Sequence, residues 1–203
     1  MAKKHINTEE HILEVAREVF MEHGFDGTSM QMIADVAGIH KSLLHYYYRT
    51  KERLFGQIFS KAFSQFIPHL GVIFMSDMTL KEKIYAFVDR YMDVFLKQPL
   101  IPLFVMQELS KNPQHLGELI RGAGIDPGLM IKNIKIAMEK EGIKMDDPRQ
   151  FFINLIGLCV FPFVARPLIQ QMLFDNDKEA YHNFILRRKK EIPELFINAM
   201  NIA

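Results

Sequence analysis

The chain has 203 residues, 49% of them hydrophobic, and its 25 Lys and Arg side chains almost balance its 24 Asp and Glu side chains. This length suits one domain or two small ones, and the composition is enough for a sizeable core. Because the net charge is only +1, global charge indicates no partner, and binding of nucleic acid would require local positive charge. The single cysteine, Cys159, excludes an internal disulfide framework.

Targeting and membrane segments are not evident in the sequence. No apolar segment follows Lys3 and Lys4, which argues against a signal peptide. The most apolar stretch, residues 151–165, is shorter than the roughly 20 residues that a membrane-spanning helix needs. Asn154 and Pro162 also interrupt it. We therefore expect a soluble, cytoplasmic protein that does not contact a membrane.

Apolar residues recur with helical spacing along the chain and strand patterns are almost absent, so we predict an all-α fold. The first helix is expected to begin near Asn7 or Thr8 and to stop at Gly24. Glu9 and Glu10 would lie in its first turn, where acidic side chains are favourable. Its apolar face consists of Ile12, Val15, Ala16, Val19 and Phe20.

Residues 28–51 read as two short helices joined by a tight turn. Thr28 and Gln31 have the spacing of a capping box for the first of them. Gly38 permits the turn, because a positive φ costs glycine little. The second helix is expected over about residues 40–47, with Lys41, Ser42, His45 and Tyr46 on one side and Leu43, Leu44 and Tyr47 on the other. This pattern is typical of a polar helix held rigidly against a DNA groove.

Positive charge is concentrated around this second helix. Within residues 38–53 the charged side chains are Lys41, Arg49, Glu52, Lys51 and Arg53, so four cations face one carboxylate. A local basic surface of this kind can bind DNA although the whole chain is nearly neutral.

A long fourth helix is expected after Thr50, which can cap it, and Pro68 is expected to end it. Its apolar stripe consists of Leu54, Phe55, Ile58, Phe59, Ala62, Phe63 and Phe66. The chain after residue 70 reads as five or six further helices. The expected start signals are Pro102, Pro113, Asp126-Pro127, Asp147-Pro148 and Asp177.

With these elements placed, the chain resembles the tetracycline-repressor (TetR) family. The matching segments are I-L-E-V-A-R-E-V-F (12–20), G-F-D-G-T-S-M-Q-M-I-A-D-V-A-G-I (24–39) and L-L-H-Y-Y-Y-R-T-K-E-R-L-F (43–55). The rest is similar only in being helical and of suitable length. The resemblance implies a three-helix helix-turn-helix DNA-binding domain over residues 1–50 and a helical ligand-binding and dimerisation domain over residues 51–203. It also implies a homodimeric, ligand-responsive repressor that binds a DNA operator.

The motif assigns DNA contacts to Thr28, His40, Lys41, Ser42, His45, Tyr46 and Lys51. Lys41 suits the O6 and N7 acceptors of guanine, and Ser42 can donate or accept. Thr28, Tyr46 and Lys51 are the expected phosphate contacts. Each of these side chains can equally be an ordinary solvated, packed or capping residue. His40 and His45 depart from the family pattern, which often has Ser or Thr at the first position and commonly Tyr at the second.

The C-terminal part is rich in Phe and Met, which can shape an adaptable apolar cavity or simply fill a core. Polar residues embedded among apolar neighbours are candidate contacts to a small-molecule effector. These candidates are Tyr91, Gln107, His115, Asn154 and Arg166. A ligand in such a cavity would move the fourth helix and favour a state that cannot bind DNA.

The run at residues 151–165 is apolar on every face, and such a helix must be covered on all sides. A second subunit can supply the cover that one small domain lacks. We therefore expect a homodimer through the helices near residues 148–173 and 177–200, packed as a four-helix interface.

Other function classes are weighed against these expectations. The sequence has no Walker loop, GxSxG, H-E-x-x-H or paired cysteines, so we expect neither an enzyme nor a resident metal or cofactor. A DNA-binding architectural or cell-division factor of the same fold, without a small-molecule inducer, remains open as the alternative. The sign of regulation, repression or activation, is also open.

Overall fold

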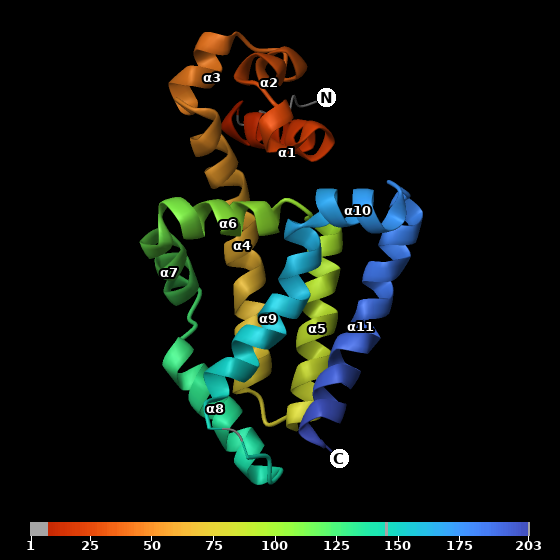
Figure 1. Ribbon diagram of the computed structural model, residues 1–203. Coiled ribbons are helices and arrows are strands. Elements are labelled where there is room, and N and C mark those ends of the chain that lie inside the picture. The colour runs from red at the N-terminus through yellow and green to blue at the C-terminus, as the bar shows by residue number, and fades with distance from the viewer. Residues whose placement is uncertain (1–7, 145, 203) are drawn as a thin grey trace, which may run out of the picture. The chain divides into compact units, whose positions relative to one another are not determined.

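The computed structural model describes residues 8–144 and 146–202, and this part of the chain contains eleven helices and no strand (Figure 1). The all-α fold is thereby confirmed. The helices are α1 (Thr8–Gly27), α2 (Met30–Val36), α3 (Lys41–Tyr47), α4 (Lys51–Met75), α5 (Leu80–Lys97), α6 (Ile101–Lys111), α7 (Pro113–Gly122), α8 (Pro127–Lys140), α9 (Pro148–Val164), α10 (Arg166–Phe174) and α11 (Lys178–Met200).

The chain forms two compact units, one ending at Phe63 and the other beginning at Ser64. The division falls within α4 and not at its start, where we expected the domain boundary between residues 50 and 51. The physical reason is that the first turns of α4 belong to the core of the N-terminal unit. Phe55 of α4 packs against Phe20 and Phe25 of α1, with ring centroids 5.1 and 4.9 Å apart.

The N-terminal unit is built around the apolar face predicted for its first helix, which is buried (Ile12, Val15, Ala16, Val19 and Phe20). Gly24 interrupts α1 with a φ of 71°, so the predicted stop is confirmed as a kink, after which one more turn continues to Gly27. That last turn carries Phe25 into the core.

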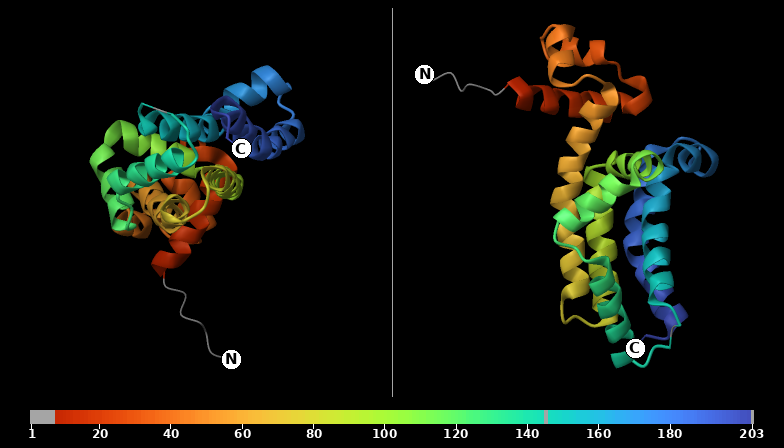
Figure 2. Two further views of the ribbon diagram at one scale, coloured as in Figure 1. Left: turned by 90° about the horizontal axis from the view of Figure 1, so that it is seen from below. Right: turned by 90° about the vertical axis from the view of Figure 1, so that its left-hand side faces the viewer.

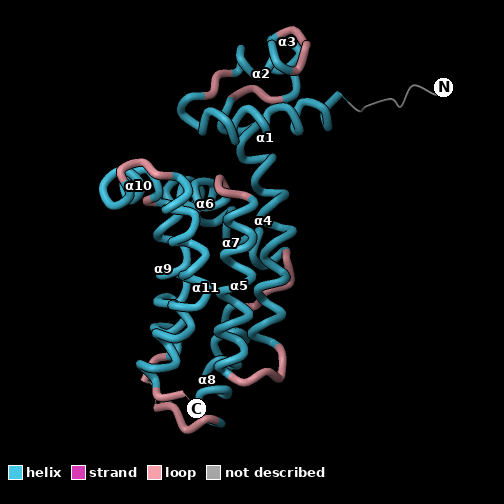
Figure 3. Tube along the Cα trace, turned by 90° about the vertical axis from the view of Figure 1, so that its right-hand side faces the viewer, coloured by secondary structure: helices cyan, strands magenta, loops and turns pink. Residues whose placement is uncertain are grey.

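The C-terminal unit is a bundle in which α5 and α11 pack along each other and α9 packs on both (Figures 1 and 2). The tube view in Figure 3 shows α6 and α10 at one end of this bundle and α8 at the other. Aromatic side chains fill its interior. Phe66 and Phe74 of α4 meet Tyr91 and Phe87 of α5, and Phe95 of α5 meets Phe163 of α9.

Three of the predicted helix starts in the C-terminal unit are confirmed by their side-chain hydrogen bonds. Asp126, Asp147 and Asp177 each accept a hydrogen bond from a backbone N–H one turn ahead, which satisfies donors that have no partner within a helix. Thr50 likewise caps α4 by accepting from the N–H of Arg53 at 3.2 Å.

Two expectations about helix ends were wrong. Pro68 lies inside α4, which runs on to Met75, because packed aromatic side chains on both sides of the proline hold the helix together. After residue 70 the described chain begins seven helices and not five or six, because α10 is a separate short helix with Pro167 in its first turn.

By length and composition, α4 and the bent pair α9–α10 are apolar enough to cross a membrane. The core helices of soluble helical proteins meet the same criteria, so these segments carry no argument for a membrane location.

Candidate DNA-binding surface and effector pockets

The N-terminal unit positions α3 by a short turn after α2. Gly38 adopts a φ of 65°, and the N–H of Ile39 donates to the carbonyl of Ala34 at 3.0 Å. Ser29, not Thr28, caps α2, because its hydroxyl accepts the N–H of Met32 at 3.1 Å. The capping box predicted for Thr28 and Gln31 was therefore wrong by one residue. The sequence T-S offers two similar hydroxyls, and only the backbone path decides between them.

The recognition helix α3 buries one narrow edge and exposes the remainder. Leu44 is completely buried and Tyr48, four residues later, is 7% exposed. Leu43 and Tyr47, which we expected to pack, are 37% and 39% exposed. Tyr48 follows the last residue of α3 with an extended backbone, and it takes the buried position that the sequence interpretation had assigned to Tyr47.

The predicted base-contacting residues all lie on the exposed part of α3 or at its start. His40 precedes the helix as its N-terminal residue and makes no side-chain cap. His45 Nδ1 lies 3.2 Å from the carbonyl oxygen of Arg49, and Tyr46 is 81% exposed. Lys41 and Ser42 are exposed in the first turn. This geometry brings short and flexible polar groups together on one accessible surface.

Two hydrogen bonds link α1 to the helix-turn-helix segment, one at the turn between α2 and α3 and one just after the end of α3. The Tyr48 hydroxyl donates to the Glu9 carboxylate at 3.1 Å, and burial together with that carboxylate raises the pKa of Tyr48, so its phenol stays neutral. His11 Nε2 lies 3.2 Å from the carbonyl oxygen of Ala37 in the turn. Neither contact was predicted. Both tie residues more than 25 positions apart, a relation that helical periodicity does not reveal.

Thr28 lies in the interior of the N-terminal unit. It is 3% exposed, and its hydroxyl donates to the carbonyl of Gly24 at 2.6 Å. The hydroxyl thus satisfies a carbonyl at the kink of α1 and does not point to solvent, which corrects its expected role as a phosphate contact.

Lys51 is engaged within the protein. Its ammonium donates to the carbonyl oxygens of Phe25 at 2.8 Å and Thr28 at 2.9 Å, and it lies 4.4 Å from the centroid of the Phe25 ring. An ammonium has three N–H donors, so one remains for a phosphate. Lys51 thus links the start of α4 to the last turn of α1 and to the residue that follows that helix.

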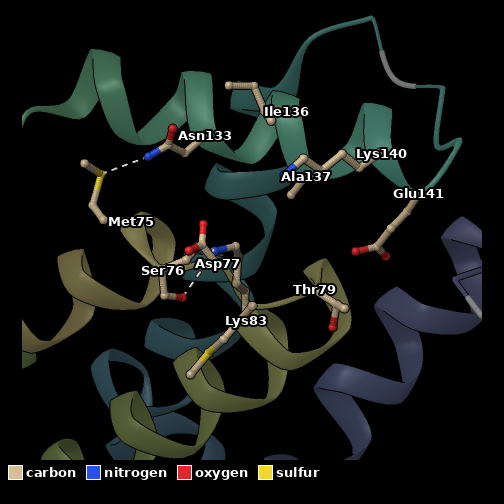
Figure 4. Close-up of a pocket in the computed structure, with 11 residues that line it drawn as sticks. Met75, Ser76, Asp77, Thr79, Lys83, Asn133, Ile136, Ala137, Lys140 and Glu141 are labelled. Carbon is tan, nitrogen blue, oxygen red and sulfur yellow. Dashed lines mark hydrogen bonds between the residues drawn. The ribbon is translucent and has the colours of Figure 1, made fainter.

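Two pockets lie in the C-terminal unit, both beside the C-terminal end of α4. One has a volume of about 230 Å³ and is lined by the end of α4, the start of α5 and the C-terminal half of α8 (Figure 4). The other has a volume of about 290 Å³ and is lined by α4, the α7–α8 loop and the start of α8. Met75 and Ser76 line both pockets.

The five predicted effector contacts line neither pocket (Tyr91, Gln107, His115, Asn154 and Arg166). Tyr91 packs in the aromatic core, where burial raises its pKa, and Asn154 is exposed on α9.

The remaining candidates have partners within the protein or lie outside the two pockets. His115 Nδ1 is paired with the Glu108 carboxylate, and Arg166 lies over the Tyr181 ring and bonds Gln170. Gln107 is half-buried on α6. These five residues thus lie outside both pockets, and their role in effector binding stays a prediction.

Lys83 is a pocket residue that the sequence interpretation missed. It is 2% exposed, and its ammonium donates to the carbonyls of Ile73 and Ser76 and to the Ser76 hydroxyl. Removal from water lowers its pKa. One signal was available: Lys83 occupies a position of the apolar stripe that also carries Leu80, Ile84 and Phe87.

A band of apolar side chains is exposed on the predicted dimer helices. On α9 the exposed stripe includes Ile153, Phe161 and Val164, while Phe151, Leu155, Cys159 and Phe163 are buried on the opposite side. On α10 the residues Leu168, Met172 and Leu173 are 58%, 70% and 71% exposed. Exposed apolar area of this kind usually marks an interaction surface.

Comparison with known proteins agrees with this architecture. Residues 12–58 match the family described as "Bacterial regulatory proteins, tetR family". The "Fatty acid metabolism regulator protein" of Bacillus subtilis (strain 168) is 23% identical over 158 residues, which cover 75% of this chain and 81% of that protein. The "Biofilm operon icaADBC HTH-type negative transcriptional regulator IcaR" of Staphylococcus epidermidis is 28% identical over 167 residues, covering 79% and 84%.

Solved structures show the same fold. The transcriptional regulator FadR from Bacillus subtilis, solved in complex with stearoyl-CoA, superposes with a TM-score of 0.57 at 19% identity. The superposition covers 88% of this chain and 96% of that chain. At this identity the likeness concerns the fold alone.

Proposed function

We propose that this chain, whose residues 12–58 match the tetR family of bacterial regulatory proteins, is a cytoplasmic repressor that binds a palindromic operator as a homodimer. A small molecule bound in the C-terminal unit releases it from DNA. Binding of DNA to regulate transcription follows from the family. The dimer, the operator symmetry, the sign of regulation and the effector are the proposed part.

The observation that carries the proposal is the exposed polar surface of α3 on a tightly held scaffold. Lys41 and Ser42 project from its first turn, and the residues at that end of a recognition helix face the base edges. His40 lies beside them, while His45 and Tyr46 extend the surface toward the phosphates. The bonds from Glu9 and His11 fix this helix before DNA arrives, which lowers the entropic cost of binding.

Dimerisation is supported by the exposed apolar band on α9 and α10. Leaving Phe161 and Leu173 in water is unfavourable, and a second copy of the same band would cover both. Two copies related by a two-fold axis would present two α3 helices to successive major grooves, about 34–36 Å apart.

An effector that carries an acyl chain is supported by the relatives. One is named a fatty acid metabolism regulator, and the related FadR structure contains stearoyl-CoA. A ligand can release DNA only if it binds the DNA-incompetent state more tightly than the competent one. The pockets beside α4 are suitable places for such a difference, because α4 is continuous with the DNA-binding unit.

Selection of bound sequences from random double-stranded DNA tests the proposal directly. We expect a palindromic sequence whose half-sites are about one helical turn apart. A non-palindromic sequence, or recovery of DNA without any shared sequence, would contradict a sequence-specific dimer. Many degenerate sites with no release by any acyl compound would instead favour an architectural role.

A further inference from the structure

The two pockets beside α4 adjoin each other, and their linings differ in chemistry. We propose that together they form one groove along the end of α4, the α4 groove, and that its occupant is an aliphatic carboxylate. The chain would lie in the pocket beside Ile125 and the carboxylate would meet Lys140. The inference rests on the proposed function in one respect only, namely that a small molecule bound in this unit controls DNA binding.

One half of the α4 groove is apolar. Val72 of α4 and Leu129 of α8 line it, and their side chains are 67% and 41% exposed. Pro68, Ile125 and Met130 complete the apolar lining. An aliphatic chain placed here would remove this surface from water, which is the main favourable contribution to binding of apolar groups.

Gly71 forms the floor of this apolar half. A Cβ atom at position 71 would lie 2.7 Å from Cγ1 and 2.9 Å from Cδ1 of Ile125. Glycine at position 71 therefore lets the Ile125 side chain of the α7–α8 loop lie directly against α4. An aliphatic chain bound beside this contact would touch both the loop and α4.

The other half of the groove is charged, and most of its charges are already engaged. The Lys83 ammonium donates to the carbonyls of Ile73 and Ser76. It also donates to the Ser76 hydroxyl (Figure 4). Asp77 interacts with this buried ammonium and raises the pKa of Lys83 against the effect of burial. Glu141 accepts the N–H of Leu80 at 2.5 Å.

Two donors of the charged half remain available to a ligand. Lys140 is exposed and has no ion-pair or hydrogen-bond partner within residues 8–144 and 146–202. Among the residues that the structure describes, the Asn133 amide donates only to the sulfur of Met75, at 3.1 Å, and a thioether is a weak acceptor (Figure 4). An ammonium and an amide that face the same pocket suit a carboxylate, because charge-assisted hydrogen bonds are the strong ones.

Isothermal titration calorimetry on the full chain tests this assignment with dodecanoate, dodecanol and acetate as probes. We expect wild-type protein to bind dodecanoate roughly tenfold more tightly than dodecanol, as one charge-assisted bond would give, and to show no measurable affinity for acetate. The Lys140→Gln variant should lose most of that preference while still binding both twelve-carbon probes.

Matched variants separate the two halves of the groove. Lys132 is exposed on the same helix but does not line either pocket, so Lys132→Gln should retain the preference of the wild type. Val72 is 67% exposed, so Val72→Ser should leave the fold intact. This variant should weaken the binding of dodecanoate and of dodecanol equally. Circular dichroism spectra should match for all three variants.

Several outcomes would overturn the α4 groove. The first is that dodecanoate does not bind. The second is that Lys140→Gln keeps the wild-type preference for dodecanoate over dodecanol. The third is that Lys132→Gln loses this preference as fully as Lys140→Gln does. DNA selection on the same samples reports on the proposed function separately. Sequence-specific DNA binding without dodecanoate binding would reject the α4 groove and keep the proposed repressor function. Dodecanoate binding without sequence-specific DNA binding would reject the repressor function and keep the groove.

Discussion

The ammonium nitrogen of Lys51 lies 2.8 Å from the carbonyl oxygen of Phe25 and 4.4 Å from the centroid of the Phe25 ring. A second bond reaches the carbonyl of Thr28 at 2.9 Å. One side chain at the start of α4 therefore satisfies one backbone acceptor in the last turn of α1 and one just after that helix, and it lies over an aromatic ring of the core. We first expected this lysine to act on phosphate alone.

Replacement of Lys51 by Met should accordingly destabilise the N-terminal unit. Loss of hydrogen bonds from a charged donor costs about 1–3 kcal/mol, and urea unfolding followed by circular dichroism measures the change. Lys61→Met is the matched control, because Lys61 is exposed on α4 and its loss should change stability by no more than about 0.5 kcal/mol. Equal stability of Lys51→Met and wild type would show that the two bonds contribute nothing in solution.

Lys41→Ala should change DNA recognition without changing stability. Lys41 is exposed on α3, and a lost contact to guanine is worth about 1–3 kcal/mol of discrimination. Competition binding with the selected operator and its single-base variants measures the discrimination. In Lys41→Ala, the affinities for the selected operator and for its single-base variants should become similar. If the variant keeps the base preference of the wild type and only its salt dependence changes, Lys41 contacts a phosphate and not a base.

Tyr48→Phe should cost about 1 kcal/mol, the usual value for one buried hydrogen bond. The ring remains to fill its place beside Leu44, but the hydroxyl that bonds Glu9 is gone. Thermal unfolding compared with Tyr46→Phe makes the test, because Tyr46 is 81% exposed and its hydroxyl should be dispensable for stability. A larger loss in Tyr46→Phe than in Tyr48→Phe would refute the role given to the Glu9 bond.

Phe161→Glu should produce a monomer. The side chain is 61% exposed on α9, and a carboxylate there would be buried without a partner in a two-fold interface. Size-exclusion chromatography with light scattering at micromolar concentration reports the mass. Leu109→Glu on α6 is the control, since Leu109 is 49% exposed and lies outside the apolar band on α9 and α10. A dimer that survives Phe161→Glu would place the interface elsewhere.

Cys159 should resist alkylation in the folded protein. Its thiol is completely buried, and burial raises its pKa to about 12. Because the thiolate is the reactive form, iodoacetamide at pH 8 should label the native chain far more slowly than the urea-unfolded chain. Mass spectrometry counts the label. Rapid labelling of native protein would mean that α9 opens more readily than its packing indicates.

The sequence predicted those features of the fold that depend on neighbouring residues. Asp126, Asp147 and Asp177 start helices because each side chain bonds a backbone N–H within its own turn. Gly38 forms the turn because its own φ is positive. Such determinants lie within a few positions of the element that they control, so periodicity and capping rules detect them.

Features that depend on distant contacts were predicted less well. Tyr48 replaced Tyr47 in the core because Leu44 fixes the buried edge of α3. Two lysines bond backbone carbonyls in the structure. Lys51 was expected to contact phosphate and Lys83 was not singled out, since nothing local indicates that they meet α1 or the end of α4. The pocket residues were missed for the same reason, because both pockets join segments more than 40 positions apart.

Pro68 within α4 has a mechanical consequence. Proline has no N–H, so the carbonyl of Ser64 receives no helical hydrogen bond from position 68. Ser64 is also the first residue of the C-terminal unit. Helix α4 contributes to both units. It therefore lacks one backbone hydrogen bond at the residue where the second unit begins. Bending α4 at that step loses one backbone hydrogen bond fewer than bending it elsewhere, so this is the step at which α4 can change direction at the lowest cost.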